Sequence, residues 1–346
     1  MIKIILKSGL YSLSAAAVLL FAVLNAGAMP LCIYDVNSPQ NVKTVKKAGF
    51  NCMQTYKQAP QELSALAKAA EANGLKMLIY PDKLINSSEL ANANKWPILA
   101  LYLYDEPDVA RLSWRNVQKL DGKAKQAFPG RQTAVVVGQG SPAENYCKSA
   151  DILMVDWYPV PHLNLSSFGK QIEDAKKILA KNKMADKPLW GVIQAFDWKD
   201  FKQYRPDDQR IGRFPEKDEM LFMAYHGLIR GINGVFFYTF TVNGKTLPEY
   251  SPEYWKRLKA AVKELNKTLP IFEKGEILPA PGKTSANILA QRRLYKGYYY
   301  DFLLNLSEVQ EPLPEEFMQK TYKALYRAKT KALAPHSVTI LRSKAK

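Results

Sequence analysis

Short apolar runs alternate with longer amphipathic segments along most of this chain. Between Pro30 and about Leu269, runs rich in aliphatic, β-branched and aromatic residues are separated by stretches of helical period. This alternation is typical of consecutive strand and helix units, which build a parallel sheet. The expected strands are Leu31–Asp35, Phe50–Tyr56, Lys76–Tyr80, Ile98–Tyr104, Thr133–Val137, Ile152–Asp156, Leu189–Gln194 and Gly234–Phe240.

The segments between these runs carry helix signals. Pro60–Ala72 has proline at a tolerated first-turn position, an apolar stripe and a stop at Gly74. Phe168–Asn182, Pro215–Arg230 and a last helix from Ser251 to about Leu265 behave similarly. Eight such units close naturally into a (β/α)8 barrel. An open doubly wound sheet would show a glycine-rich phosphate loop after the first strand, and the sequence there contains no glycine.

The pattern changes after Gly275. The stretches 296–306, 321–329 and 337–342 alternate with a period near two and are joined by turns that contain proline. We therefore expect an α/β fold with a (β/α)8 TIM barrel over residues 29–274 and a small antiparallel β domain over 275–346.

The first 28 residues resemble a secretory signal peptide. Lys3 and Lys7 precede an apolar stretch that ends in the small residues Ala26-Gly27-Ala28. The apolar stretch is too short for a comfortable membrane span of about 20 residues. The pattern predicts cleavage after Ala28, a secreted or periplasmic protein, and no membrane attachment afterwards. Nothing in the pattern indicates an oligomeric state.

The chain is strongly basic, with a formal net charge of +17. Its lysines and arginines are spread along the whole sequence, without a concentrated tract or a nucleic-acid-binding motif, which argues against nucleic acid as a partner. A basic surface attracts anionic partners. An acidic glycan therefore stays open as a substrate.

The cysteines and histidines indicate neither a disulfide framework nor a metal or cofactor site. The chain has three cysteines and three histidines, none at a spacing typical of zinc ligands. Cys32 and Cys52 lie in runs assigned to neighbouring parallel strands. We expect buried free thiols there rather than a strained cross-strand bridge.

Carboxylates stand at the ends of several expected strands, where barrel enzymes place their chemistry. The fourth strand leads into Asp105 and Glu106, the sixth into Asp156 and the first into Asp35. Glycoside hydrolysis commonly needs two carboxyl groups, one protonated and one ionised. Aromatic side chains on which sugar rings stack occur in the same regions, namely Tyr102, Tyr104, Trp157, Tyr158, Trp198 and Tyr238.

The stretch Tyr104-Asp105-Glu106-Pro107 resembles the acid/base strand of retaining (β/α)8 glycoside hydrolases of the β-galactosidase and cellulase type. The resemblance implies that Glu106 is the general acid. Those enzymes carry a nucleophilic Glu at the end of strand seven, where this chain has Gln194. Three possibilities follow: Asp156 is the second carboxylate, Asp197 reaches in from the loop, or Asp105 orients a 2-acetamido group of the substrate.

The sequence thus predicts an exported glycosidase acting on an oligo- or polysaccharide, with a catalytically inactive glycan-binding barrel as the alternative. The predicted catalytic residues are Glu106, Asp156 and Asp105. The predicted substrate-binding residues are Asp35, Tyr104, Trp157, Tyr158, Gln194, Trp198 and Tyr238. Structural roles compete for some of them: Asp105 and Asp108 could cap the following helix, and Asp35 could be a structural residue of the barrel mouth.

Overall fold

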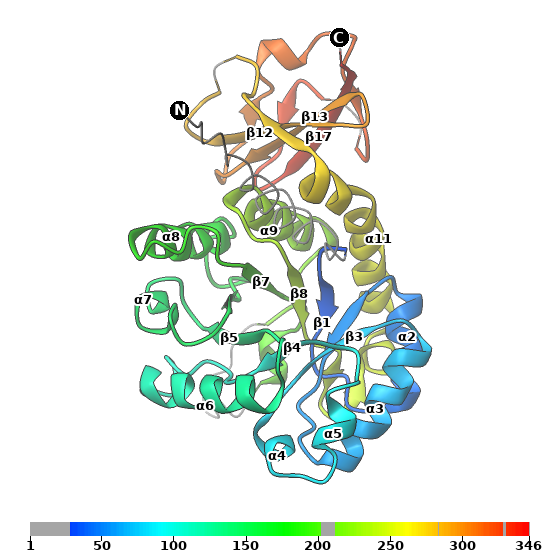
Figure 1. Ribbon diagram of the computed structural model, residues 1–346. Helices are drawn as coiled ribbons and strands as arrows, with labels where there is room; N and C mark the ends of the chain where they lie inside the picture. Colours follow the sequence, from blue (N-terminus) through cyan, green and yellow to red (C-terminus); the bar gives the residue numbers. More distant parts are fainter. Residues whose placement is uncertain (1–27, 202–211, 283, 328–329, 346) are drawn as a thin grey trace, which may run out of the picture.

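The computed structural model describes residues 28–201, 212–282, 284–327 and 330–345, and the expected signal peptide lies outside these ranges except for its last residue. Eight parallel strands form a closed barrel in chain order (Figure 1). They are β1 Leu31–Ile33, β2 Cys52–Gln54, β3 Lys76–Ile79, β4 Ile98–Tyr102, β5 Thr133–Val137, β6 Ile152–Trp157, β7 Leu189–Gln194 and β8 Val235–Tyr238. The predicted (β/α)8 barrel is confirmed, with several strands shorter than expected.

Helices surround the barrel (Figure 1). They are α2 Pro39–Lys47, α3 Pro60–Ala72, α4 Asp82–Ile85, α5 Leu90–Ala93, α6 Trp114–Ala127, α7 Ala143–Tyr146, α8 Ser167–Lys181, α9 Lys217–Arg230, α10 Leu247–Tyr250 and α11 Pro252–Lys274. A capping box formed by Glu216 and Glu219 begins α9, and Gly231 in the left-handed region ends it. None of the helices in the described ranges has the length and apolar character needed to cross a membrane.

Helix α11 is longer than expected and continues through Pro270. A proline inside a helix removes a hydrogen bond and costs about 3 kcal/mol. The turn beyond Pro270 nevertheless buries Ile271 and Phe272, and the ring of Phe272 lies 4.5 Å from that of Phe302 in the β domain. Burial of this apolar surface offsets the cost, so the helix connects the barrel to the sheet.

The C-terminal part is antiparallel, as predicted. Its five-stranded sheet has the order β11-β12-β13-β17-β15, and β14 pairs with β16. The bounds are β11 Glu276–Leu278, β12 Ile288–Tyr295, β13 Tyr298–Asn305, β14 Glu311–Pro312, β15 Lys323–Ala324, β16 Ala332–Leu333 and β17 Val338–Lys344. β11 and β12 were not predicted, and the strand expected over 321–329 is reduced to β15, with residues 328 and 329 outside the described ranges.

Two layers of apolar side chains stabilise the barrel. Val135, Leu153 and Ile193 alternate outward toward the helices, while Val136, Met154 and Val192 fill the interior. The outer core continues into the β domain through Phe302 and Leu304. Every second side chain of a strand therefore points toward the barrel axis. The last of these inward side chains on each strand lies at the mouth of the barrel.

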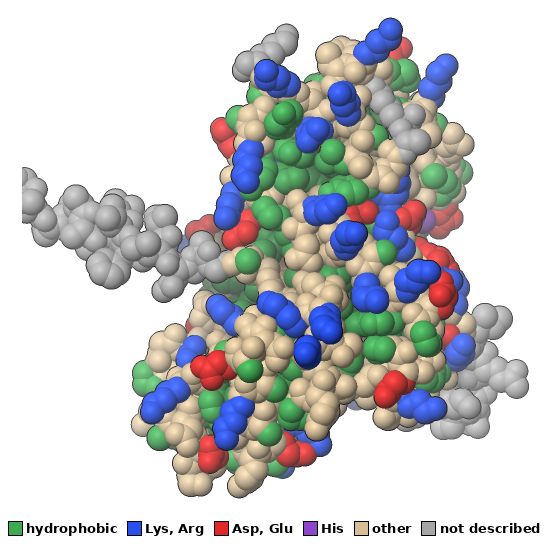
Figure 2. Space-filling model, turned by 90° about the vertical axis from the view of Figure 1, so that its right-hand side faces the viewer, with side chains coloured by type: hydrophobic (Ala, Val, Ile, Leu, Met, Phe, Trp, Pro, Cys, Tyr) green, Lys and Arg blue, Asp and Glu red, His purple; other side chains and the backbone are tan. Residues whose placement is uncertain are grey.

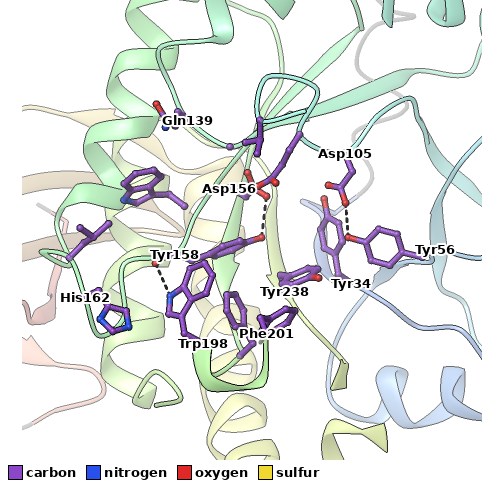
Figure 3. Close-up of a pocket in the computed structure, with 16 residues that line it drawn as sticks. Tyr34, Tyr56, Asp105, Gln139, Asp156, Tyr158, His162, Trp198, Phe201 and Tyr238 are labelled. Carbon is purple, nitrogen blue, oxygen red and sulfur yellow. Dashed lines mark hydrogen bonds between the residues drawn. The ribbon is translucent and has the colours of Figure 1, made fainter. Parts of the chain in front are cut away.

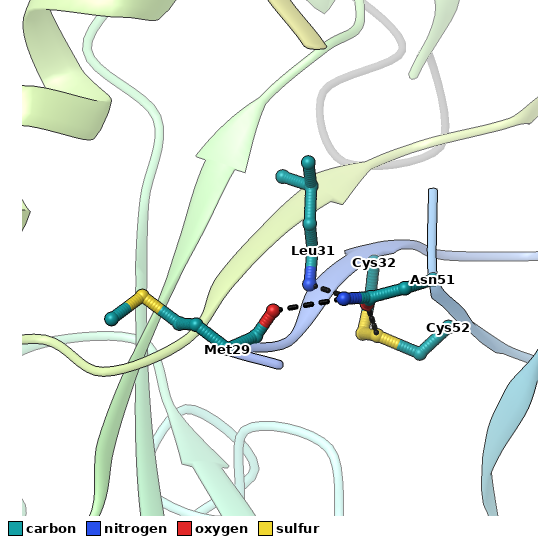
Figure 4. Close-up of a disulfide and its surroundings, with 5 residues drawn as sticks. All are labelled: Met29, Leu31, Cys32, Asn51 and Cys52. Atoms are coloured by element: carbon teal, nitrogen blue, oxygen red, sulfur yellow. Dashed lines mark hydrogen bonds between the residues drawn. A yellow bond between two sulfur atoms is a disulfide. The ribbon is translucent and has the colours of Figure 1, made fainter. Parts of the chain in front are cut away.

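Cys32 and Cys52 form a disulfide inside the barrel (Figure 4). The prediction of free thiols was wrong for this pair. The register of β1 and β2 places the two residues directly opposite each other, with Cα atoms 4.5 Å apart, and both side chains belong to the interior core. The expectation of a strained bridge did not consider that residues directly opposite each other on neighbouring parallel strands point to the same side of the sheet. Cys147 is a buried free cysteine.

His226 should make the fold sensitive to acid. It lies in α9, is 3% exposed, and its Nδ1 has no hydrogen-bond partner in the described part of the chain. Burial and the nearby Arg230 lower its pKa to about 3. Between about pH 6.5, the ordinary pKa of histidine, and the lowered pKa in the folded state, the imidazole is protonated in the unfolded chain but neutral in the folded chain. The free energy of unfolding therefore falls as the pH drops below about 6.5.

We expect the melting temperature to fall less for His226→Gln than for the wild type when the pH is lowered from 7.5 to 4.5. Differential scanning calorimetry at several pH values checks this. Parallel melting curves for the two proteins would contradict the assignment of acid sensitivity to this side chain.

Candidate active site

A cavity of about 860 Å³ opens at the carboxyl ends of the barrel strands (Figure 3). Its lining combines carboxyl groups with aromatic rings. The lining residues are Tyr34, Tyr56, Asp105, Glu106, Val109, Gly138, Gln139, Asp156, Trp157, Tyr158, His162, Leu163, Phe196, Trp198, Phe201 and Tyr238. The size and the mixture of apolar walls with a few polar groups are typical of a small-ligand site.

Two tyrosines hold the carboxylate of Asp105. The hydroxyl of Tyr102, at the end of β4, donates to Oδ1 over 2.6 Å. That of Tyr56, beyond β2, donates to Oδ2 over 2.9 Å, as Figure 3 shows. Asp105 is exposed to the cavity, yet the protein around its carboxyl displaces enough water to raise its pKa, against the lowering effect of these two hydrogen bonds. The group is oriented, and it faces open space.

The loop after β4 turns sharply at Glu106, which adopts a φ of 45° in the left-handed region. Asp108 fixes this turn, because both of its oxygens accept the backbone N–H of Gly138 over 3.1 Å. Neither Asp105 nor Asp108 caps the following helix, since the side chain of Ser113 accepts the hydrogen bond at the start of α6. The expected capping role was wrong because the helix begins six residues after Asp108, at Trp114.

Glu106 and Asp156 form a carboxyl pair on the cavity wall. Both side chains line the cavity, and they lie close enough for each to influence the ionisation of the other. Oδ2 of Asp156 accepts from the hydroxyl of Tyr158 over 3.2 Å, and Oδ1 has no hydrogen-bond partner among the described residues. Burial raises the pKa of both groups, and the charge of Glu106 raises that of Asp156 further. The pair therefore retains one proton to higher pH than an isolated carboxyl would.

Gly138 leaves room for the carboxyl of Glu106. A Cβ at this position would lie 3.3 Å from Glu106 Oε1 and 2.8 Å from Cγ2 of the exposed Val109. Because a small misplacement of a reacting group is costly, we expect Gly138→Ala to lower kcat about 10-fold on any glycan that the protein cleaves. Its melting temperature should change little, since Val109 can move aside.

Gly122→Ala is a matched control, because a Cβ there meets nothing within 4 Å. Initial rates and thermal melts of both variants test the prediction. Equal rates for Gly138→Ala and Gly122→Ala would show that contact with Glu106 does not matter.

Two residues considered at strand seven lie outside the cavity lining. Gln194 is fully buried and uses its whole amide: Nε2 donates to the carbonyls of Val160 (2.8 Å) and Phe196 (3.2 Å), and Oε1 accepts from the N–H of Val160 (2.9 Å). Asp197 is 1% exposed, and its carboxylate binds Lys199 twice: it accepts from the backbone N–H of Lys199 and pairs with the Lys199 ammonium group, both at 3.0 Å. Gln194 thus fixes the loop after β6 and is not placed for substrate binding.

Tyr104 and Asp35 were also expected to bind substrate, and they lie elsewhere. Strand β4 ends at Tyr102, and the chain then turns Tyr104 onto the outer apolar core. Asp35 accepts a hydrogen bond from the Asn37 side chain and gives its backbone carbonyl to Thr241. Both residues support the mouth without lining the cavity.

The other aromatic residues predicted to bind substrate line the cavity, whereas Tyr102, also expected as a stacking surface, is fully buried in the barrel interior. Trp157 is held by a 2.8 Å hydrogen bond from Nε1 to Ser167 Oγ, and Trp198 donates to the carbonyl of Tyr158 (Figure 3). The rings of Tyr158 and Tyr238 stack with centroids 5.7 Å apart. The sequence reasoning missed Tyr34, Tyr56, Phe196, Phe201 and His162. For the two tyrosines a signal existed, since each lies on the inward phase of its strand just past the strand end.

No protein-family model matches the sequence, and no curated protein is similar to it. Solved structures resemble the fold. Amy13B of Eubacterium rectale has a TM-score of 0.57 at 8% identity, covering 92% of this chain and 96% of that chain. A GH30 endoxylanase from Clostridium papyrosolvens C71 has a TM-score of 0.53 at 11% identity, covering 92% and 98%.

An α-amylase from Geobacillus thermoleovorans, complexed with acarbose, has a TM-score of 0.51 at 12% identity and also covers 92% and 98% of the two chains. At such identities the likeness concerns the fold alone. Together with the closed eight-stranded barrel, it establishes that this chain has a (β/α)8 glycoside hydrolase-like fold.

Proposed function

We propose that this protein is a glycoside hydrolase in which Glu106 protonates the leaving oxygen. The observation that carries the proposal is the Glu106–Asp156 carboxyl pair on the wall of an aromatic cavity at the carboxyl end of the barrel. A general acid must keep its proton near neutral pH, and burial beside a second carboxyl achieves this. Structures with this fold and carbohydrate ligands, such as the acarbose complex above, are consistent with it.

Asp156 acts in this scheme as a positioning residue that shares the proton. Asp156 is 6% exposed and one of its oxygens accepts from Tyr158, whereas Glu106 is half-buried and lines the cavity, so Glu106 is the member of the pair with an oxygen available to the substrate. A second catalytic carboxylate needs an oxygen that reaches the substrate, whereas the side chain of Asp156 is almost fully buried. Asp156 is therefore a poor choice for the second catalytic carboxylate.

Asp105 is the better candidate for that second role. It lies exposed to the cavity, oriented by Tyr56 and Tyr102, and its charge can stabilise the oxocarbenium-like transition state. In the reaction the bond from the anomeric carbon to the leaving oxygen breaks, and Glu106 gives its proton to that oxygen. Water supplies the new hydroxyl group, and its remaining proton returns to the pair.

The test is hydrolysis of a panel of natural oligo- and polysaccharides by purified protein, with products identified by mass spectrometry. Cleavage of at least one glycan, with loss in Glu106→Gln, is the expected result. Binding of a glycan without any cleavage would instead favour the catalytically inactive barrel. The anomeric configuration of the first product, read by NMR, then distinguishes a covalent Asp105 intermediate from direct attack by water.

We also propose that the protein is exported, on the strength of the signal-peptide pattern in residues 1–28. Cell fractionation followed by N-terminal sequencing tests this. A mature protein outside the cytoplasm that begins near Met29 is expected, and an intact N-terminus on cytoplasmic protein would contradict it.

A further inference from the structure

The cavity is negative although the protein as a whole is positive. Asp105, Glu106 and Asp156 line it, and no lysine or arginine does so within the described ranges. The outer surface is different: Figure 2 shows lysine and arginine side chains scattered over the face that includes α2 and α11. Exposed lysines there are Lys43, Lys46, Lys47, Lys256, Lys259, Lys263 and Lys267. At physiological ionic strength salt screens charges beyond about 8 Å, so a ligand inside the cavity senses mainly the carboxyls.

Among the residues that the structure describes, the carboxyl groups of the cavity have no cationic partner. Asp105 is held by neutral tyrosine hydroxyls, and Asp156 by the hydroxyl of Tyr158. The charge of Asp105 acts unfavourably on Glu106 and on Asp156. Like charges in a site with little water repel one another until a positive group enters. The cavity is therefore complementary to a cation.

Its walls favour an organic cation over a metal ion. The described residues contain no cluster of three or more His, Cys, Asp or Glu side chains that could hold a metal. Aromatic rings instead surround the position next to Asp105: the ring of Tyr34 lies 6.4 Å from that of Tyr56 and 5.7 Å from that of Tyr238. Aromatic faces attract ammonium groups and also stack on sugar rings.

We propose that the substrate is a glycan of unacetylated amino sugars, whose protonated amine binds between the Asp105 carboxylate and the rings of Tyr34, Tyr56 and Tyr238. The inference rests on the proposed glycosidase function and names its substrate class. It also replaces the acidic glycan that the net charge alone left open, because the negative charge of the same carboxyl cluster would repel a uronic acid.

Binding can be measured without turnover in Glu106→Gln. Isothermal titration calorimetry at pH 6.5 compares a glucosamine tetramer with its N-acetylated counterpart and with the glucose tetramer of the same linkage. The galactosamine series is tested in parallel. We expect the free amino sugar of at least one series to bind about 10-fold more tightly than both counterparts, and this advantage to shrink at high salt.

A second substitution tests the role of Asp105. Glu106→Gln/Asp105→Asn should bind the amino and acetylated forms within about threefold of each other, since the ionic partner is gone. Glu106→Gln/Asp186→Asn is the matched control: it removes the same charge from an exposed surface position and should keep the full preference.

The outcomes separate the inference from the proposed function. Binding preference for the amino sugar without any hydrolysis by the wild type would contradict the glycosidase function and leave the inference standing. Hydrolysis of neutral or acidic glycans, together with equal or weaker binding of every amino sugar, would overturn the inference and leave the function standing. Absence of binding to all amino sugars would also overturn it.

Discussion

Glu106→Gln is expected to lower kcat/KM on an unactivated oligosaccharide by about 10²- to 10⁴-fold, the usual contribution of general acid catalysis. Glutamine keeps the shape of the side chain but cannot transfer the proton that the Glu106–Asp156 pair holds. Glycosides with very acidic leaving groups need little protonation. Their turnover should therefore fall much less than that of the natural substrate.

Initial rates on a natural oligosaccharide and on a dinitrophenyl glycoside of the same sugar check this. Glu71→Gln makes the same chemical change on the exposed face of α3 and should leave both rates unchanged. A uniform loss on both substrates would indicate damaged substrate binding rather than a missing acid. Wild-type rates for Glu106→Gln would remove Glu106 from the mechanism.

Gln194→Glu is expected to destabilise the protein by about 3 kcal/mol at pH 7, without raising activity. The substitution introduces the residue type that retaining glycoside hydrolases with an acid/base strand similar to Tyr104-Asp105-Glu106-Pro107 carry at strand seven. However, the amide of Gln194 donates to two buried carbonyls, those of Val160 and Phe196, and a carboxylate cannot donate. Three oxygen acceptors would then face one another without water.

The effect should depend on pH. Burial without a positive partner raises the pKa of the introduced carboxyl above its unfolded value of about 4.3, so the loss of stability grows as the pH rises above that value. Urea unfolding at pH 5 and pH 7 measures this, with Gln61→Glu on exposed α3 as the control. Unchanged stability with increased turnover would show that position 194 faces the substrate after all.

The barrel was predictable from the sequence because its strands carry continuous apolar runs and its helices carry separate stripes and stops. Those signals are local, and each survives in the structure within a few residues. The β domain was harder to predict. Strand β12 contains Arg292, which binds Asp301, and Arg293, which donates to the carbonyl of Phe272. Because these charged residues stand at buried or partly buried positions, the strand lacks a clear alternation of apolar and polar residues.

The candidate site was predictable only in part. The strand-end position of Asp105, Glu106 and Asp156 follows from the sequence, but the pairing of Glu106 with Asp156 on the cavity wall does not. That pairing depends on the turn at Glu106 and on the bond from Gly138 to Asp108, which connect different loops. The same limit applies to Gln194, whose partners come from another loop, and to the Cys32–Cys52 disulfide, which depends on strand register.

The pH dependence of kcat/KM in Asp156→Asn tests the central claim, that the proton shared by Glu106 and Asp156 is the catalytic proton. With a neutral neighbour in place of Asp156, Glu106 holds the proton alone, and the repulsion that delays loss of the last proton from the carboxyl pair is gone, so the apparent pKa of the acid should fall below that of the pair. The alkaline limb of the profile should therefore move to lower pH than in the wild type, while activity near the acidic optimum persists. An alkaline limb at the same pH in both proteins would contradict the account.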